Sequence, residues 1–322
     1  MLTNRIENQN WNQVPNPFFT IITPVYNREK TLHRTLMSVE AQTFRNMEYI
    51  IIDDGSADTS REIARNYLEH SSLPVCLLEK ENGGVHTARN EGYKAARGQL
   101  IICIDSDDEL LPTACEVFHR VWQSIPEAKR NEYWQIKARC KNQRGEACSK
   151  PFPENINEMD REEAYAYFSA SKGEQIGCRS AKIMKNNLFP EPENVKFVTE
   201  VVVWLPLEKK YRSWATNEYV RIYHQEGEDH LSNVKTKSIQ SCRNAMWNSA
   251  YALNHKELFI RSGKKYIVTL LRYNIMKIIL SKDEKPVEIP LENRAERISA
   301  LLLWLPSLFG AKIYRKKYLK GD

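Results

Sequence analysis

The chain lacks a hydrophobic run long enough to cross a membrane. Its two most apolar stretches, residues 266–280 and 298–309, are broken by Arg272 and Lys277 in the first and by Pro306 in the second. Because a spanning helix needs about 20 consecutive apolar residues, we expect no transmembrane segment. Internal repeats and low-complexity tracts are missing as well, so the 322 residues are available for one large domain and an appendage.

Cysteine is scarce and its spacing is irregular. The seven cysteines are an odd number without paired spacing, and we find no signal peptide, which favours a reducing cytosol over a disulfide framework. Cys140 and Cys148 have no close second pair, which argues against a four-ligand zinc site. Cys76, Cys103 and Cys115 fall in predicted strands or helices, where they serve as small apolar residues.

Acidic residues are scarce in the carboxyl-terminal part. Residues 231–322 hold 18 Lys and Arg against 7 Asp and Glu, a net charge of +11, whereas the whole chain carries +6 and residues 1–230 therefore −5. The basic residues adjoin aromatic ones, namely Trp304, Phe309, Tyr314 and Tyr318 beside Lys312, Arg315, Lys316, Lys317 and Lys320. This pattern suits a segment in the headgroup plane of an anionic leaflet; the alternative is a helical cap with a solvated basic face. No recognised nucleic-acid-binding module accompanies it, so we expect no nucleic-acid partner.

The amino-terminal half repeats one pattern, in which an apolar strand, a polar loop and an amphipathic helix follow one another. The predicted strands are residues 18–23, 48–52, 74–78 and 100–104. Leu32, Leu36 and Val39 share one face of the first helix, and Asp58 or Thr59 can cap the second. Because the strands are continuously apolar, helices must cover both of their faces. The sequence therefore predicts an α/β fold with a doubly wound, mostly parallel sheet.

Ligands of such sheets bind beyond the carboxyl ends of the strands, and four polar loops fall there. These loops are residues 24–27, 53–56, 82–84 and 105–108. The last one carries Asp105, Asp107 and Asp108. Asp105 and Asp107, two residues apart, can share one hard divalent cation, Mg²⁺ or Mn²⁺, which would bridge to a diphosphate. Taken alone, a DSDD tetrapeptide could also be a polar loop that caps a helix.

The motifs TPVYN, IIDDGSAD, NGGVHTARNEG and IDSDD, in this order and at this spacing, resemble the nucleotide-binding half of the family-2 glycosyltransferases with the GT-A fold. The resemblance covers residues 18–125 strongly and 126–230 loosely. It implies an inverting enzyme that takes a sugar from a nucleotide diphosphate and leaves a β-linked product when the donor is α-linked.

The resemblance also assigns roles within the DSDD run, the DXD motif of the family. Asp107 would bond the metal directly, and Asp105 would bind a ribose hydroxyl or a metal-bound water. Ser106 belongs to the same donor-binding motif. Asp108 would position the sugar or cap the next helix.

The other loops contain further nucleotide-binding candidates. We expect Pro24 to end the first strand, and Tyr26 to lay its ring beside a base unless it packs in the core; Asn27 completes this loop. Asp53 or Asp54 can accept the N3 proton of a uracil or a ribose hydroxyl, while the other caps a helix. We favour Asp54 slightly as the ligand.

The loop after the third strand and the helix that follows it complete this set. Gly83 and Gly84 let the backbone approach a ligand closely because they have no side chains. Arg89 suits a phosphate or base contact, unless it forms an exposed salt bridge.

The transfer also needs a base that deprotonates the acceptor hydroxyl. Family members commonly carry an acidic pair at the start of a helix about 90 residues after the metal motif. Here Thr199 could cap that helix and Glu200 is the predicted base, but Val201 replaces the second acid. The alternative is that Glu200 only stabilises the helix amino terminus. The acids near Asp160 are weaker candidates.

A Gly-containing loop, residues 223–232, holds His224 and His230 near acids. Related transferases often place a flexible loop here that can supply a histidine as a further metal or phosphate ligand. Either histidine could serve, although a surface histidine without such a role is the more common case.

The predicted organisation is a lead-in at residues 1–17, a GT-A catalytic domain at 18–230 and a basic helical region at 231–322 that could anchor to a membrane surface. The predicted enzyme is a hexosyl- or N-acetylhexosaminyltransferase, with a UDP-sugar as the favoured donor. We expect a glycan acceptor, most readily a lipid-linked one, in surface polysaccharide or lipopolysaccharide synthesis. The expected location is cytoplasmic and peripheral, at the inner face of the membrane.

Two rival interpretations remain. A nucleotidyltransferase of the same fold would show a Gly-rich loop with Arg and Lys directly after the first strand, and PVYN is not such a loop. A non-catalytic member that binds nucleotide sugars or scaffolds a glycan-assembly complex is supported only by the missing second acid beside Glu200.

Overall fold

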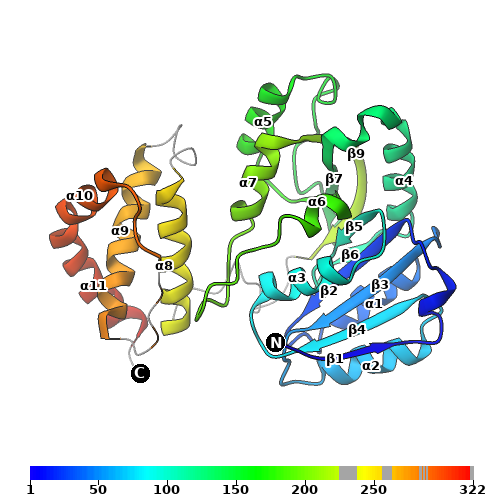
Figure 1. Cartoon of the computed structure of the whole chain (residues 1–322), viewed down its shortest axis with the longest axis horizontal. Helices are drawn as coiled ribbons and strands as arrows, with labels where there is room; N and C mark the ends of the chain where they lie inside the picture. Colours follow the sequence, from blue (N-terminus) through cyan, green and yellow to red (C-terminus); the bar gives the residue numbers. More distant parts are fainter. Residues whose placement is uncertain (225–237, 256–262, 283–284, 286, 288, 320–322) are drawn as a thin grey trace. The chain divides into compact units, whose positions relative to one another are not determined.

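The structure is a computed structural model that describes residues 1–224, 238–255, 263–282, 285, 287 and 289–319 (Figure 1). The chain divides into two compact units. Unit 1 comprises residues 1–189 and 203–226, and unit 2 comprises residues 190–202 and 227–322. The stretch 190–202, which we placed in the catalytic domain, belongs to unit 2.

Unit 1 is built on one nine-stranded sheet with the order β1-β4-β3-β2-β5-β8-β7-β9-β6. Its central strands pair in parallel, as predicted: β2 (Phe19–Val25), β3 (Met47–Asp53), β4 (Val75–Lys80) and β5 (Leu100–Cys103). Every residue of β2, β3 and β4 is buried. The expected α/β fold with a mostly parallel central sheet is therefore confirmed.

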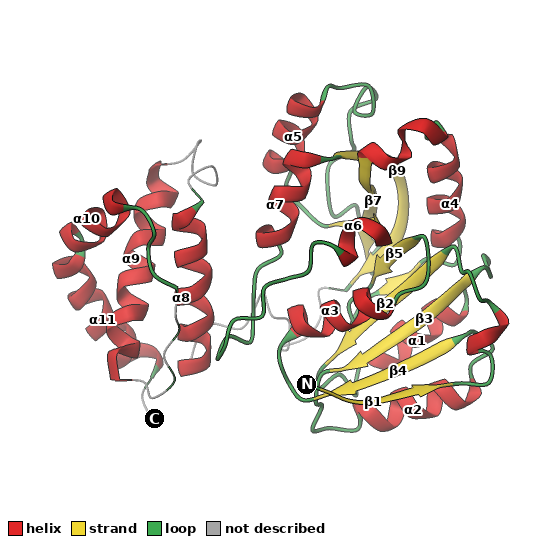
Figure 2. Cartoon of the chain, viewed as in Figure 1, coloured by secondary structure: helices red, strands yellow, loops and turns green. Residues whose placement is uncertain are grey.

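Helices cover both faces of this parallel region (Figure 2). They are α1 (Leu32–Glu40), α2 (Ser60–His70) and α3 (Val85–Ala95). Ile21 packs in one core cluster with residues of α1 and α2. On the other face α3 comes so close that a Cβ at Gly92 would lie 2.7 Å from Ile22 and 3.0 Å from Ile52. Successive strand residues therefore bury against different helices, which is why the strand sequences are apolar throughout.

Two details of the amino-terminal part differ from expectation. β1 (Leu2–Glu7) pairs antiparallel with β4, so residues 1–17 add an edge strand to the sheet and are more than a lead-in. β2 continues through Pro24 to Val25, so Pro24 does not end it. Of the two candidate caps of α2, Thr59 occupies the N-cap position without a side-chain cap bond, while the carboxylate of Asp58, one residue earlier, accepts the Ser60 N–H at 3.0 Å.

The second half of the sheet is mixed. It contains β6 (Glu109–Leu110), β7 (Tyr133–Asn142), β8 (Gln175–Ser180) and β9 (Arg212–Tyr223). β5 and β7 both pair antiparallel with β8, whereas β7 and β9 pair in parallel. The accompanying helices are α4 (Ala114–Ser124), α5 (Arg161–Ala170), α6 (Ala181–Lys185) and α7 (Val201–Lys210). Short 3₁₀ helices occupy Trp11–Gln13, Glu127–Glu132 and, in unit 2, Leu280–Lys282.

Unit 2 is helical, in line with the predicted carboxyl-terminal extension. Its helices are α8 (Ile239–Asn254), α9 (Gly263–Ile279), α10 (Arg294–Leu302) and α11 (Trp304–Tyr318). They share one apolar core, in which Leu270 of α9 packs with Ala300 of α10 and Ala311 of α11. The last helices are therefore part of a folded core. None of the helices that the structure describes combines the length and apolar character that a bilayer crossing demands.

The stretch 190–202 is held by α8 within unit 2. Asn248 accepts the Thr199 N–H at 2.9 Å, and Asn244 accepts the Lys196 N–H at the same distance. The Tyr251 hydroxyl donates to the Val202 carbonyl at 3.1 Å. Side chains of one helix thus satisfy backbone groups of a segment that is irregular up to residue 200 and then enters α7.

Candidate functional site

The loops after β2 and β3 are joined to each other by hydrogen bonds. The Asn27 N–H donates to the Ser56 hydroxyl at 3.1 Å, and the Asn27 side chain accepts the Ala57 N–H at 2.8 Å. Asn27 has a φ of 51°, a left-handed conformation that asparagine tolerates better than most residues. Tyr26, 46% exposed, does not pack in the core and is accessible for stacking on a base.

Asp54 organises the loop after β4. Its Oδ1 pairs with the Lys80 ammonium at 2.5 Å and accepts the Gly83 N–H at 2.9 Å, while its Oδ2 accepts the Gly84 N–H at 2.7 Å. The Asn82 side chain donates to the Asp54 carbonyl at 3.0 Å. Because Asp54 is only 2% exposed and both oxygens accept bonds from the chain itself, it positions this loop. Our preference for Asp54 over Asp53 as the base ligand is revised accordingly.

Asp53 is also held by the chain, but its partner reaches solvent. Its Oδ2 lies 2.8 Å from an Arg61 guanidinium nitrogen, and its Oδ1 accepts the Ser56 N–H at 3.2 Å. The Arg61 side chain is 36% exposed, whereas the Asp53 side chain is fully buried. Both acids are buried and bonded by the chain, but Asp53 has the more exposed counterion, so we now prefer it to Asp54 as the candidate for a nucleoside contact.

Arg89 and Asp105 form an ion pair at the carboxyl end of β5, with 3.0 Å between guanidinium nitrogen and carboxylate oxygen. The Asp105 side chain is 45% exposed and that of Arg89 only 11%. Burial raises the pKa of the Asp105 carboxyl, but the positive charges of Arg89, Arg221 and Arg179 outweigh it, so its pKa lies below its ordinary value. Asp105 is therefore ionised at neutral pH and presents a charged oxygen at the loop.

The backbone of the DSDD loop is anchored to the first helix. Three side chains donate to its carbonyl oxygens: Thr31 to Ser106 at 3.0 Å, Arg34 to Asp107 at 3.1 Å and Thr35 to Asp108 at 2.7 Å. This anchoring fixes the loop independently of its carboxylates. Asp105 and Asp107, both partly exposed, are thus carried on a rigid support.

Asp108 faces the protein interior. It is fully buried, accepts the His224 N–H at 3.0 Å and lies 3.3 Å from an Arg221 guanidinium nitrogen. Burial raises its pKa to about 7, although the Arg221 charge opposes the shift. Since α4 begins only at Ala114, Asp108 does not cap that helix; its sugar contact stays a prediction. Its role is to tie the DSDD loop to the end of β9.

One of the two histidine candidates lies beside the loop. The His224 Nε2 is 2.6 Å from a carboxylate oxygen of Glu109, the residue that follows the DSDD run. His230 lies outside the described residues. Within the described part of the chain, no group of three or more His, Cys, Asp or Glu side chains converges as a metal cage.

The donor set nevertheless fits Mg²⁺ or Mn²⁺. A small hard cation in a nucleotide-dependent enzyme is commonly held by one or two carboxylates, with phosphate and water oxygens filling the other positions. Asp105 and Asp107 supply such a pair, and the ionised state of Asp105 meets the need for a charged ligand.

Glu200 directly precedes α7 and lies in unit 2, in the stretch that α8 holds. Its neighbour Thr199 is fixed through its N–H by Asn248. Val201, at the place of the family's second acid, is 42% exposed. The proposed role of Glu200 as a base remains a prediction.

Three basic side chains that organise the site were not among the residues predicted from the sequence. Lys80, Arg61 and Arg221 carry no motif signature, and Arg221 is 81 positions from the cysteine that accepts its Nε–H, Cys140, at 3.2 Å. The available signal was the pair Glu79 and Lys80, two charges at the end of a strand whose other residues are apolar. Such a charge requires a buried partner.

Comparisons with known proteins agree with this geometry. Residues 20–128 match the family described as Glycosyl transferase family 2. The putative glycosyltransferase EpsH of Bacillus subtilis is 41% identical over 100 residues, which are 31% of this chain and only 29% of that relative. The GalNAc(5)-diNAcBac-PP-undecaprenol beta-1,3-glucosyltransferase of Campylobacter jejuni is 25% identical over 270 residues, 83% of each chain.

Solved structures share the fold over almost the whole chain. Staphylococcus aureus TarS 1–349, crystallised with UDP-GlcNAc, has a TM-score of 0.53 at 16% identity, and the match covers 92% of this chain and 91% of TarS. The mannosyltransferase PcManGT of Pyrobaculum calidifontis, in complex with GDP-Man and Mn²⁺, has a TM-score of 0.54 at 15% identity, over 92% of this chain and 84% of its own. At these identities the match establishes the fold.

Proposed function

Residues 20–128 are a family-2 glycosyltransferase domain, and from this premise we propose that the chain transfers a sugar, with inversion, from a nucleotide-diphosphate sugar to a glycan acceptor. The observation that carries the proposal is the anchored DSDD loop, in which an ionised Asp105 pairs with Arg89 at the carboxyl end of β5. The polar loops after β2, β3 and β4 surround the same edge of the sheet. This is where ligands of doubly wound sheets bind.

The donor side of the reaction is assigned to unit 1. Tyr26 would stack on the base, Asp53 would contact the nucleoside, and Arg89 would face the diphosphate. A divalent cation held by Asp107 and Asp105, Mn²⁺ or Mg²⁺, would neutralise charge on the leaving diphosphate. A UDP-sugar is our favoured donor; TarS was crystallised with UDP-GlcNAc, and PcManGT with GDP-Man and Mn²⁺.

Glu200 is the proposed general base. Its carboxylate would remove the proton of the attacking hydroxyl on the side of the anomeric carbon opposite the leaving group. Asn248 and Asn244 hold the backbone on which it is carried.

The proposed acceptor is a lipid-linked glycan in surface polysaccharide or lipopolysaccharide-type synthesis. The name of the Campylobacter relative includes PP-undecaprenol, and that protein aligns over most of both chains. The basic excess of residues 231–322 suits contact with an anionic membrane surface. We accordingly propose a peripheral location on the cytoplasmic face.

A second candidate function is binding of nucleotide sugars without catalysis. The observation that favours it is Val201, an exposed apolar residue where the family has a second acid. Turnover distinguishes the two functions, because a binding protein would retain donor affinity without releasing nucleoside diphosphate.

The test is a screen of nucleotide sugars for release of nucleoside diphosphate, with and without Mn²⁺. Asp107→Asn should abolish the metal-dependent release. Glu218→Gln is the matched control, since it removes one exposed carboxylate of unit 1 whose partner is the surface residue Arg120. If the protein binds a nucleotide sugar but releases nucleoside diphosphate from none of the donors tested, even with an extract that contains acceptors, the non-catalytic alternative is favoured.

A further inference from the structure

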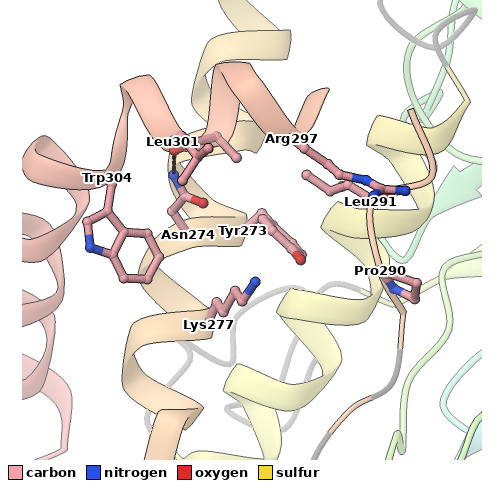
Figure 3. A pocket seen from close by; sticks show the side chains of 9 residues that line it. Tyr273, Asn274, Lys277, Pro290, Leu291, Arg297, Leu301 and Trp304 are labelled. Atoms are coloured by element: carbon pink, nitrogen blue, oxygen red, sulfur yellow. Dashed lines mark hydrogen bonds between the residues drawn. The ribbon is translucent and has the colours of Figure 1, made fainter. Parts of the chain in front are cut away.

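Unit 2 contains a pocket of about 370 Å³ between α9, α10 and the segment that precedes α10 (Figure 3). Its wall is mostly apolar, with two basic side chains, Lys277 from α9 and Arg297 from α10. None of the proposed donor-site residues lines it. The pocket is therefore a different site from the proposed donor site.

The polar groups of the pocket divide into structural ones and available ones. Arg297 donates to the Leu291 carbonyl at 2.8 Å and to the Glu292 carbonyl at 3.0 Å, which holds the preceding segment against α10. Asn274 also has a structural role, because its amide donates to the Ala300 carbonyl at 2.7 Å and so joins α9 to α10.

Lys277 and Tyr273 are the remaining donors: within the described residues neither side chain has a hydrogen bond, and the Lys277 ammonium lies 5.8 Å from the centroid of the Tyr273 ring. Figure 3 shows the Lys277 ammonium and the Tyr273 hydroxyl pointing toward the same space. Tyr273 is 4% exposed, and burial raises the pKa of its hydroxyl, so it stays protonated and can donate a hydrogen bond. An ammonium and a hydroxyl within apolar walls fit a phosphate oxygen whose attached group is apolar.

The mouth of the pocket joins an exposed apolar surface. Leu301 and Trp304 line the pocket and are 71% and 37% exposed. They continue into a stripe on α10 and α11, which we call the outer face; its members are Leu301, Leu302, Leu305, Leu308, Phe309 and Ile313. Helices of soluble domains normally turn such a stripe toward the core, so an outward stripe indicates a binding surface.

Charge distinguishes a membrane from a second copy of this chain as the partner. Lys312, Lys316 and Lys317 lie on α11 together with the outer face. In a two-fold symmetric contact the same patch of both copies meets, which would bring these like charges together. An anionic lipid surface attracts them instead.

We propose that this pocket binds the phosphate headgroup of an anionic membrane lipid, while the outer face contacts its acyl chains. The inference rests on the membrane contact in the proposed function, but it does not depend on sugar transfer. It gives that contact a defined binding site in addition to diffuse attraction.

The test is binding of a short-chain, water-soluble phosphatidic acid to the full-length protein, measured by calorimetry. Lys277→Gln should weaken binding by about tenfold or more, the scale of a hydrogen bond to a charged group. The matched control is Lys312→Gln, which removes one charge of α11 outside the pocket and should weaken binding by about fivefold or less. Equal effects of the two substitutions would contradict the proposal that the pocket binds the lipid headgroup.

A second pair of variants tests the pocket mouth. Leu301→Glu and Leu305→Glu place the same charge at two exposed positions of the outer face, but only Leu301 lines the pocket. Leu301→Glu should reduce short-chain lipid binding more strongly, and equal losses would contradict the proposal. Inorganic phosphate in molar excess should not displace the lipid; if it does, the pocket is a site for free anions.

The same preparations separate failure of this inference from failure of the proposed function. If the protein releases nucleoside diphosphate from a donor but does not bind the lipid, the proposed lipid site is contradicted and the proposed transferase function is not. Specific lipid binding without release from any donor would support the pocket and contradict the transferase assignment.

Discussion

Replacing Asp54 by alanine tests whether this residue positions a loop or binds the nucleotide. In the structure its carboxylate is 2% exposed and pairs with the Lys80 ammonium, itself 5% exposed, at 2.5 Å. Removing one partner of a buried ion pair leaves the other charge uncompensated, which costs about 3–5 kcal/mol. We therefore expect Asp54→Ala to lower the free energy of unfolding by about that amount.

The double variant Asp54→Ala, Lys80→Met provides the internal check. It removes the Lys80 ammonium that Asp54→Ala leaves buried without its partner. The double variant should therefore be more stable than Asp54→Ala alone, with a coupling free energy of about 1–3 kcal/mol between the two sites. Glu218→Ala is the control, because it removes a solvent-exposed pair with Arg120 and should leave stability nearly unchanged.

The assay is urea unfolding without metal or nucleotide, so that ligand binding does not contribute to stability. Donor binding is measured on the same variants under native conditions. Our reasoning would be refuted if Asp54→Ala unfolded within about 1 kcal/mol of the natural protein yet lost donor binding completely. That result would restore Asp54 as a direct ligand.

Three further predictions concern the metal, the base and the acid sensitivity of unit 1. Asp107→Ala should abolish transfer and weaken donor binding in Mn²⁺, and chelation should have the same effect; near-normal, metal-stimulated turnover would remove Asp107 from the metal site. Glu200→Gln should lower turnover by about 10²-fold with donor affinity unchanged by calorimetry, whereas equal losses of both would make Glu200 structural. The hydrogen bonds from Arg65 lower the pKa of Glu79 below its ordinary 4.5, so their contribution to stability is present above that pH and is lost as the pH falls through the lowered pKa. Unfolding measured between neutral and acidic pH should therefore show a slope that Glu79→Gln flattens, and an unchanged slope would contradict the assignment.

The parallel core was predictable because its residues follow a simple physical rule. Ile21 and Ile22 bury against different helices, so both faces of the strand must be apolar, and the sequence shows this directly. The loops after these strands were predictable for the same reason, since strand ends determine where the polar segments begin.

The inner organisation of the site was not predictable from local patterns. Asp54 binds Lys80, 26 positions away, and Asp108 binds the backbone of His224, 116 positions away. A carboxylate in a polar loop has the same local signature whether it faces solvent or the core. The interpretation of Asp108 as a helix cap was therefore wrong, because α4 begins only at Ala114, whereas its sugar contact stays a prediction for a residue that is buried beside Arg221.

The assignment of residues 190–202 to unit 2 also could not be predicted from the sequence. Nothing in the sequence of residues 190–202 points to α8, and the contacts with Asn248, Asn244 and Tyr251 show that they belong to unit 2. Similarly, β1 has few apolar residues, since it is an edge strand that pairs through its backbone with β4.

The bonds between α8 and the Glu200 segment have a consequence for the order in which the chain matures on the ribosome. Thr199 is separated from its partner Asn248 by 49 positions. At synthesis rates of roughly 5–20 residues per second, this segment waits roughly 2 to 10 seconds for its anchor. During that interval the strands and loops of the donor side are already made, whereas the proposed base is not yet held. A nascent or prematurely terminated chain would thus gain donor recognition before chemical competence.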